Sequence, residues 1–77
     1  MKVKVYPGPF CNTEELNSDG FLKLNDKSTV NDALKKLKYP MPLRIMGLYM
    51  INYKPAKLNA KLKDGDIISV FTPLSGG

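Results

Sequence analysis

Residues 62–77 read LKDGDIISVFTPLSGG, and this stretch decides the fold. The Asp64–Gly65–Asp66 segment is typical of a tight turn. The residues at 67–71 that follow it are β-branched or aromatic at four of five positions, which favours a strand. Pro73 has no backbone N–H, so strand pairing should end there. The sequence therefore predicts a last strand over residues 67–71, followed by a short uncharged segment that ends in two glycines.

Alternating polar and apolar residues predict two further strands near the N-terminus. KVKVY at 2–6 and FLKLN at 21–25 each alternate, so each strand should bury one face. The Pro-Gly-Pro segment at 7–9 should end the first strand, and Asp19–Gly20 should open the second. An antiparallel pair is the simplest topology for these two strands.

A helix is predicted over residues 30–38. Thr29 can cap its first turn, and Asp32 occupies the position of the acidic residue in a capping box. Tyr39–Pro40 should end the helix, because the residue before a proline is disfavoured in the helical region. The apolar stripe that the helix should bury consists of Val30, Ala33, Leu34 and Leu37.

The remaining segments complete a two-layer fold. Pro40–Met41–Pro42 should be a stiff connector, and residues 48–53 are rich in strand formers and end in a polar turn. Residues 56–63 have weak periodicity and should form an irregular crossing anchored by Leu58 and Leu62. The order strand, strand, helix, strand, strand predicts an α+β domain with one helix against one face of a four-stranded sheet.

Length and composition limit the possible functions. The 77 residues suffice for one domain, and 43% hydrophobic with 25% charged residues is typical of a globular domain. Without histidine and with the single cysteine Cys11, the chain offers no zinc site, histidine-based triad or internal disulfide. We therefore predict no metal site. No apolar run is long enough to span a bilayer or to serve as a signal peptide, so we expect a cytoplasmic protein.

The charge is distributed unevenly along the chain. The formal net charge is +5, and no acidic residue lies between Asp32 and Asp64. Eight cationic side chains lie in that interval: Lys35, Lys36, Lys38, Arg44, Lys54, Lys57, Lys61 and Lys63. With the tyrosines among them, they are compatible with a small nucleic-acid-binding module, although no recognised binding motif accompanies them. The other interpretation is a basic face that orients the domain on acidic proteins.

Several segments resemble the ThiS/MoaD sulfur-carrier family. The segment at 62–67 and the one at 70–77 are similar to the family's C-terminal pattern, roughly L-x-D-G-D-x-V followed by an apolar strand and a final Gly-Gly. TVNDAL at 29–34 is similar to the family's helix start. The ending FTPLSGG at 71–77 is most similar to that of the molybdopterin synthase small subunit, apart from Thr72, where that ending has a proline.

The resemblance implies a ubiquitin-like β-grasp fold. Such a fold is a four- to five-stranded mixed sheet with one main helix packed on one face. The strands at 2–6 and 67–71 would then lie side by side, parallel, in the centre of the sheet. Residues 1–73 would form the domain and residues 74–77 a flexible C-terminal tail.

The resemblance also implies a carrier or co-substrate without catalytic residues of its own, such as the small subunit of a molybdopterin synthase-like enzyme. A ubiquitin-activating-type adenylyltransferase would use ATP to adenylate the carboxylate of Gly77, and sulfide would displace AMP to leave a thiocarboxylate. The carrier would bind no cofactor itself. It would pass sulfur to the large subunit of molybdopterin synthase or to a thiazole synthase. An alternative with the same fold is a protein modifier conjugated to lysines through Gly77.

Two groups of residues are expected to contact these partners. Leu74, Ser75 and Gly76 should thread the carboxylate of Gly77 into the partner's nucleotide pocket, because four extended residues reach at most ~14 Å. The second group should form a docking surface. Strand alternation places two of its members on the sheet face away from the helix, and the third follows the last strand: Phe21, Phe71 and Pro73.

Overall fold

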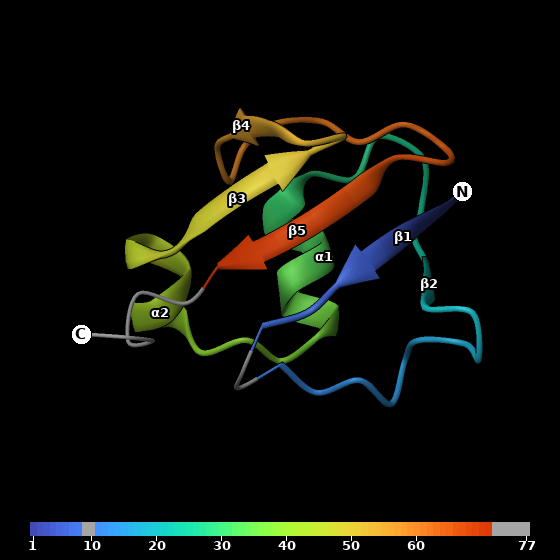
Figure 1. The fold of residues 1–77 in the computed structure, drawn as a ribbon, viewed down its shortest axis with the longest axis horizontal. Helices are drawn as coiled ribbons and strands as arrows, with labels where there is room; N and C mark the ends of the chain where they lie inside the picture. Colours follow the sequence, from blue (N-terminus) through green and yellow to red (C-terminus); the bar gives the residue numbers. More distant parts are fainter. Residues whose placement is uncertain (9–10, 72–77) are drawn as a thin grey trace.

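The computed structural model describes residues 1–8 and 11–71, and these form a five-stranded mixed sheet with two helices (Figure 1). In chain order the elements are β1 (Lys2–Tyr6), β2 (Phe21–Lys23), α1 (Val30–Lys36), α2 (Met41–Met46), β3 (Leu48–Ile51), β4 (Lys54–Ala56) and β5 (Ile67–Phe71). The strand order across the sheet is β2-β1-β5-β3-β4. This is the β-grasp fold expected from the resemblance.

The first and last strands form the parallel pair in the interior of the sheet. Lys4 lies opposite Ile67, and Tyr6 lies opposite Ser69. The flanking pairs, β1 with β2, β3 with β5 and β3 with β4, are all antiparallel. The predicted parallel, central arrangement of the strands at 2–6 and 67–71 is therefore confirmed.

One sheet face and α1 enclose the core. Alternate strand residues such as Val3, Leu22 and Ile68 point to this face and are fully buried. They pack with the apolar stripe of α1, whose Val30 and Leu34 are also inaccessible to solvent. Because the strands contribute every second residue and the helix every third or fourth, the two layers share one continuous core.

The start of α1 is fixed by the predicted capping box. The Thr29 hydroxyl oxygen accepts a hydrogen bond from the backbone N–H of Asp32 at 3.3 Å, and the Asp32 carboxylate accepts one from the backbone N–H of Thr29 at 2.9 Å. The hydrogen bonds that the Thr29 backbone N–H and the Thr29 hydroxyl donate to the Asp32 carboxylate favour its charged form and lower the pKa of Asp32. The stabilisation by this carboxylate is therefore present above its ordinary pKa of 3.8 and is lost as the pH falls through the lower value in the folded state.

The helix ends two residues earlier than predicted. The N–H of Tyr39 donates to the carbonyl of Leu34 at 3.1 Å, and the N–H of Lys38 donates to that of Lys35 at 3.0 Å. Lys38 has a φ of 53°. This pair of bonds around a left-handed residue is a Schellman motif, here formed without glycine. Leu37 is consequently the C-cap, although its side chain stays in the core.

A second, six-residue helix occupies the segment predicted to be a connector. Pro40 is the N-cap of α2, and Pro42 lies in its first turn. The N–H groups of a first turn have no acceptor within the helix, so a proline there removes no helical hydrogen bond. Prolines at 40 and 42 are thus compatible with the start of a helix as well as with an extended connector. Within the described residues, neither this helix nor any other is long and apolar enough to cross a membrane.

The strand predicted from residue 48 is β3, and the polar turn predicted at its end connects it to a further strand, β4, which was not predicted. Asn52 and Tyr53 have φ values of 51° and 66°, so both central residues of the turn are left-handed, as a type I′ turn requires. Pro55 lies in β4, which is an edge strand, the position where a sheet tolerates proline. At the opposite edge, β2 comprises three residues rather than the five predicted.

The capping box gives a direct test of how α1 is stabilised. We expect Thr29→Ala to lower the free energy of unfolding by ~1 kcal/mol, because it leaves the N–H of Asp32 without its side-chain acceptor. Thr13→Ala is the matched control, since Thr13 is exposed and precedes no helix. Urea denaturation of both variants at neutral pH measures the difference. Equal stabilities would contradict the assigned cap.

Candidate functional site

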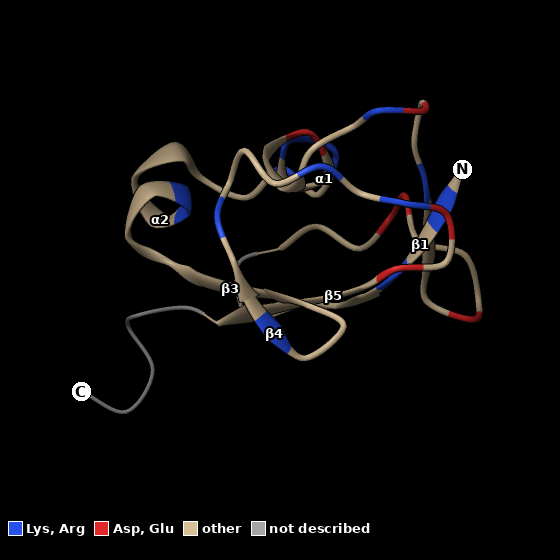
Figure 2. Ribbon diagram, turned by 90° about the horizontal axis from the view of Figure 1, so that it is seen from above, with Lys and Arg blue, Asp and Glu red and all other residues tan. Residues whose placement is uncertain are grey.

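One face of the sheet is not covered by a helix. Figure 2 shows α1 and α2 on the same side of the strands. Along β5, Ile68 and Val70 point to the helical side and are buried, whereas Ile67 and Phe71 point to the opposite side and retain exposed surface. We call this second side the outer face. A partner could reach this face of the described sheet without displacing a helix.

An apolar patch lies on the outer face where β5 ends. Leu48 is paired with Phe71, and Met50 is paired with Ser69, which also lies opposite Tyr6 on β1. The side chains of Leu48 and Phe71 are 71% and 50% exposed. We refer to Tyr6, Leu48, Met50 and Phe71 as the outer-face patch. Contiguous exposed apolar side chains of this kind are typical of protein interaction sites.

Ser69 is a small residue that lies between larger residues of the outer-face patch. Its side chain points to the outer face, yet the residue is only 8% exposed. The flanking residues Tyr6 and Met50, on the strands to either side, are much larger than serine and cover it. The small residue therefore allows the large side chains around it to form a continuous surface.

Phe21 shares the outer face with Phe71 but lies at the other end of it. Phe21 is paired with Lys4, which is opposite Ile67, four residues before Phe71. Four strand residues correspond to about 13 Å along the sheet. The ammonium groups of Lys2 and Lys4 lie 5.5 and 5.3 Å from the Phe21 ring centre, so the ring is half-buried beneath cations. The structure thus places the two aromatic residues on one face without bringing them together.

The predicted tail residues lie outside the described part of the chain. These are Leu74, Ser75, Gly76 and Gly77, together with Pro73 of the predicted docking surface. The described part of the chain ends at Phe71, which is the last residue of β5. The six C-terminal residues therefore continue directly from the outer-face patch.

Cys11 does not have the features of a reactive thiol. It is half-buried and forms no disulfide, and burial raises the pKa of its thiol. A raised pKa lowers the fraction of nucleophilic thiolate at neutral pH. The side chain packs against the core, as expected for a small apolar residue in the loop after β1.

The two aspartates before β5 hold the turn together. Asp64 accepts a hydrogen bond from the backbone N–H of Lys2 at 2.8 Å. Asp66 accepts bonds from the N–H of Lys63 at 2.8 Å and from the side-chain amide of Asn52 at 3.0 Å. These bonds tie the turn before β5 to β1 and to the β3–β4 hairpin. Among the described residues, no three carboxylate or thiol side chains are grouped as metal ligands.

Three members of the outer-face patch, Tyr6, Leu48 and Met50, were not predicted from the sequence. Tyr6 lies at the end of an alternating strand, and the alternation predicts that its side chain is exposed. Alternation does not indicate which strand lies beside it. Leu48 begins a predominantly apolar segment in which polar and apolar residues do not alternate. The sequence therefore does not indicate on which face of the sheet Leu48 lies. The pairing of Leu48 with Phe71 depends on the register between β3 and β5, which is a property of the tertiary structure.

Comparisons with known proteins agree with this architecture. No curated protein shows significant similarity to the chain. The crystal structure of SAMP1 from Haloferax volcanii is similar in fold, with a TM-score of 0.61 and 24% sequence identity over 99% of this chain and 97% of that one. The ThiS family matches residues 7–77, which include α1, the outer-face patch from Leu48 onwards and the two terminal glycines. The chain therefore belongs to the ThiS family.

Proposed function

We propose that this protein is a sulfur carrier whose C-terminal carboxylate, that of Gly77, is converted into a thiocarboxylate. The observation that carries the proposal is that the match to the ThiS family extends to Gly77 itself. The match therefore includes the group on which the chemistry would take place, as well as the fold. Sulfur delivery to molybdopterin or thiazole synthesis is the corresponding role.

The proposed chemistry has two steps, and both involve the carboxyl group of Gly77. In the first, a carboxylate oxygen attacks the α-phosphate of ATP, pyrophosphate leaves, and an acyl-adenylate forms. In the second, sulfide attacks the acyl carbon, the bond to AMP breaks, and the thiocarboxylate remains. The first step is needed because a carboxylate is a poor electrophile, whereas AMP is a good leaving group. A ubiquitin-activating-type adenylyltransferase would supply ATP and the catalytic groups.

The fold suits a protein that presents its own C-terminus. β5 is paired on both sides, with β1 and β3, so the base of the C-terminal segment is held rigidly. The six residues after Phe71 can span at most ~20 Å, which would let Gly77 enter a narrow pocket while the domain stays outside. Gly76 and Gly77 have no side chain to obstruct such a channel. In this proposal Leu74 and Ser75 contact the channel mouth.

The outer-face patch would dock the domain on its partners. It adjoins the start of the C-terminal segment, so a protein that binds the patch is positioned to receive Gly77. Lys2, Lys4 and Lys23 lie on the same face near Phe21. A partner with an apolar centre and acidic groups to one side would complement both regions and be oriented by them. The adenylyltransferase and the sulfur-accepting synthase would use this face in turn.

The role of the terminal carboxylate can be tested by changing the length of the chain. We expect deletion of Gly77 to abolish ATP-dependent thiocarboxylation by the cognate activating enzyme, because the carboxylate would then be one residue, about 3.5 Å, short of its reaction partner. Gly76→Val should also react poorly, since its side chain adds bulk and restricts the backbone. Intact mass measures the product, and unchanged urea denaturation shows that folding is unaffected. Wild-type thiocarboxylation of the deletion variant would show that the terminal carboxylate is not the reactive group.

The docking role of the outer-face patch can be tested at its centre. We expect Phe71→Asp to raise the KM of the activating enzyme for the carrier about tenfold or more, because it places a charge in an apolar interface. The value of kcat should change little. Tyr53→Asp is the matched control, because Tyr53 is an aromatic residue with 64% exposure at the β3–β4 turn, off the patch. Equal KM values for the two variants would exclude the patch as the docking surface.

A further inference from the structure

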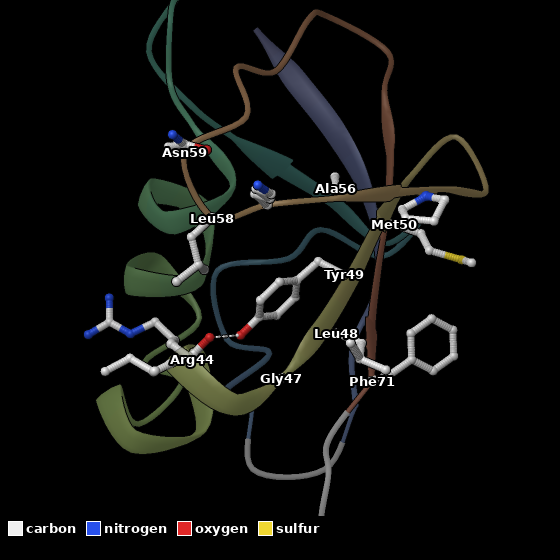
Figure 3. A pocket seen from close by; sticks show the side chains of 12 residues that line it. Arg44, Gly47, Leu48, Tyr49, Met50, Ala56, Leu58, Asn59 and Phe71 are labelled. Carbon is white, nitrogen blue, oxygen red and sulfur yellow. Dashed lines mark hydrogen bonds between the residues drawn. The ribbon is translucent and has the colours of Figure 1, made fainter.

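A groove lies at the edge of the sheet beside α2, and residues from both faces of the sheet line it. Its volume is about 800 Å³, and its lining is predominantly apolar. Ile45 from α2, Tyr49 from β3 and Leu58 from the loop after β4 contribute to it (Figure 3). The groove extends past Gly47 to Leu48 and Phe71, so it is continuous with the outer-face patch.

Arg44, which also lines the groove, is a buried cation, and no acidic side chain of the described residues pairs with it. The residue is only 8% exposed. Its Nη1 donates a hydrogen bond to the side-chain oxygen of Asn31 at 3.1 Å, and its Nε atom is buried without any hydrogen-bond acceptor. The one ion pair within residues 1–8 and 11–71 joins the Met1 amino group and Asp26, away from this site. Buried arginines are normally paired, because an unpaired buried charge is costly.

The backbone around Arg44 is held in place. The Tyr49 hydroxyl donates a hydrogen bond to the Arg44 carbonyl, as Figure 3 shows. This bond requires a close approach at the turn between α2 and β3, where a Cβ atom on Gly47 would lie only 2.7 Å from the Tyr49 hydroxyl oxygen. Arg44 is therefore positioned before any partner binds, which reduces the entropic cost of using it as a ligand.

The charges around the groove are all positive. Lys57 lines the groove directly, and Lys54 lines the adjoining depression along β4. No acidic residue lies between Asp32 and Asp64, so the segment that forms the groove has no carboxylate of its own. The groove thus combines an apolar lining, lysines at its rim and a buried arginine without a counter-ion.

We propose that this groove binds a short acidic segment of a partner protein. Apolar side chains of that segment would pack against Tyr49 and Leu58, and a carboxylate next to them would pair with the Arg44 guanidinium. Lys54 and Lys57 would attract further acidic residues on either side of this carboxylate in the bound segment. The groove shares Leu48, Met50 and Phe71 with the outer-face patch, whereas Arg44 and the residues around it lie outside the patch. Binding of a carboxylate at Arg44 is therefore additional to the proposed carrier chemistry at Gly77 and does not depend on it.

A matched pair of peptides tests the site on the wild-type protein. The probes are acetyl-Leu-Glu-Phe-amide and acetyl-Leu-Gln-Phe-amide, which differ only in the carboxylate. We expect the acidic peptide, at millimolar concentration, to shift the amide NMR signals of Arg44, Gly47, Tyr49 and Leu58. It should bind at least about fivefold more tightly than the neutral peptide, because it forms a charge-assisted hydrogen bond at a partly buried site.

Two variants assign this difference to Arg44. Arg44→Gln should bind both peptides equally and weakly, whereas Lys35→Gln, an exposed residue on α1 outside the groove, should retain the preference. Equal affinity of the two peptides for the wild-type protein would overturn the proposal, whether or not Arg44→Gln folds. So would the absence of binding, or shifts confined to other surfaces. None of these outcomes involves Gly77, so they leave the proposed carrier function untouched.

Discussion

The parallel pairing of β1 with β5 is the constraint on which the rest of the structure depends. It joins residues 2–6 to residues 67–71, near the two ends of the described chain, so the segments between must fold back to either side. β2 and α1 complete one half, and the β3–β4 hairpin completes the other. The same pairing encloses β5 between two strands and brings its end to Phe71, from which the C-terminal residues continue. A carrier that must present its last residue needs such a fixed base.

The elements whose signals are local could be predicted from the sequence. Thr29 and Asp32 define the start of α1, alternation defines β1, and β-branched and aromatic residues define β5, because all of these signals are set by neighbouring residues. α2 and β4 could not be predicted in this way. Their prolines, at 40, 42 and 55, are equally compatible with a connector, and only the packing of Tyr49 under α2 and the edge position of β4 determine the outcome. The end of α1 was missed because a lysine, instead of glycine, adopts the left-handed conformation.

The sheet face that carries the candidate site could be predicted from the sequence, but the set of residues that forms the site could not. Alternation placed Phe71 and Phe21 on the face away from the helix, and the structure agrees. Their separation and the addition of Leu48 depend on strand register, which residue patterns alone do not determine. Arg44 illustrates the same limit. In the sequence it is one of eight cations in an acid-free interval, whereas in the fold it is the one that α2 buries beside Asn31.

The central claim is that Gly77 carries sulfur, and the mass of the protein isolated from its native cells tests this claim most directly. The account predicts a population whose intact mass is higher by the replacement of one oxygen atom with sulfur, and fragmentation should assign that change to Gly77. An unmodified mass throughout, together with Gly-Gly remnants of this chain on lysines of other proteins after proteolysis, would contradict it. That result would identify the protein as a modifier instead of a sulfur carrier.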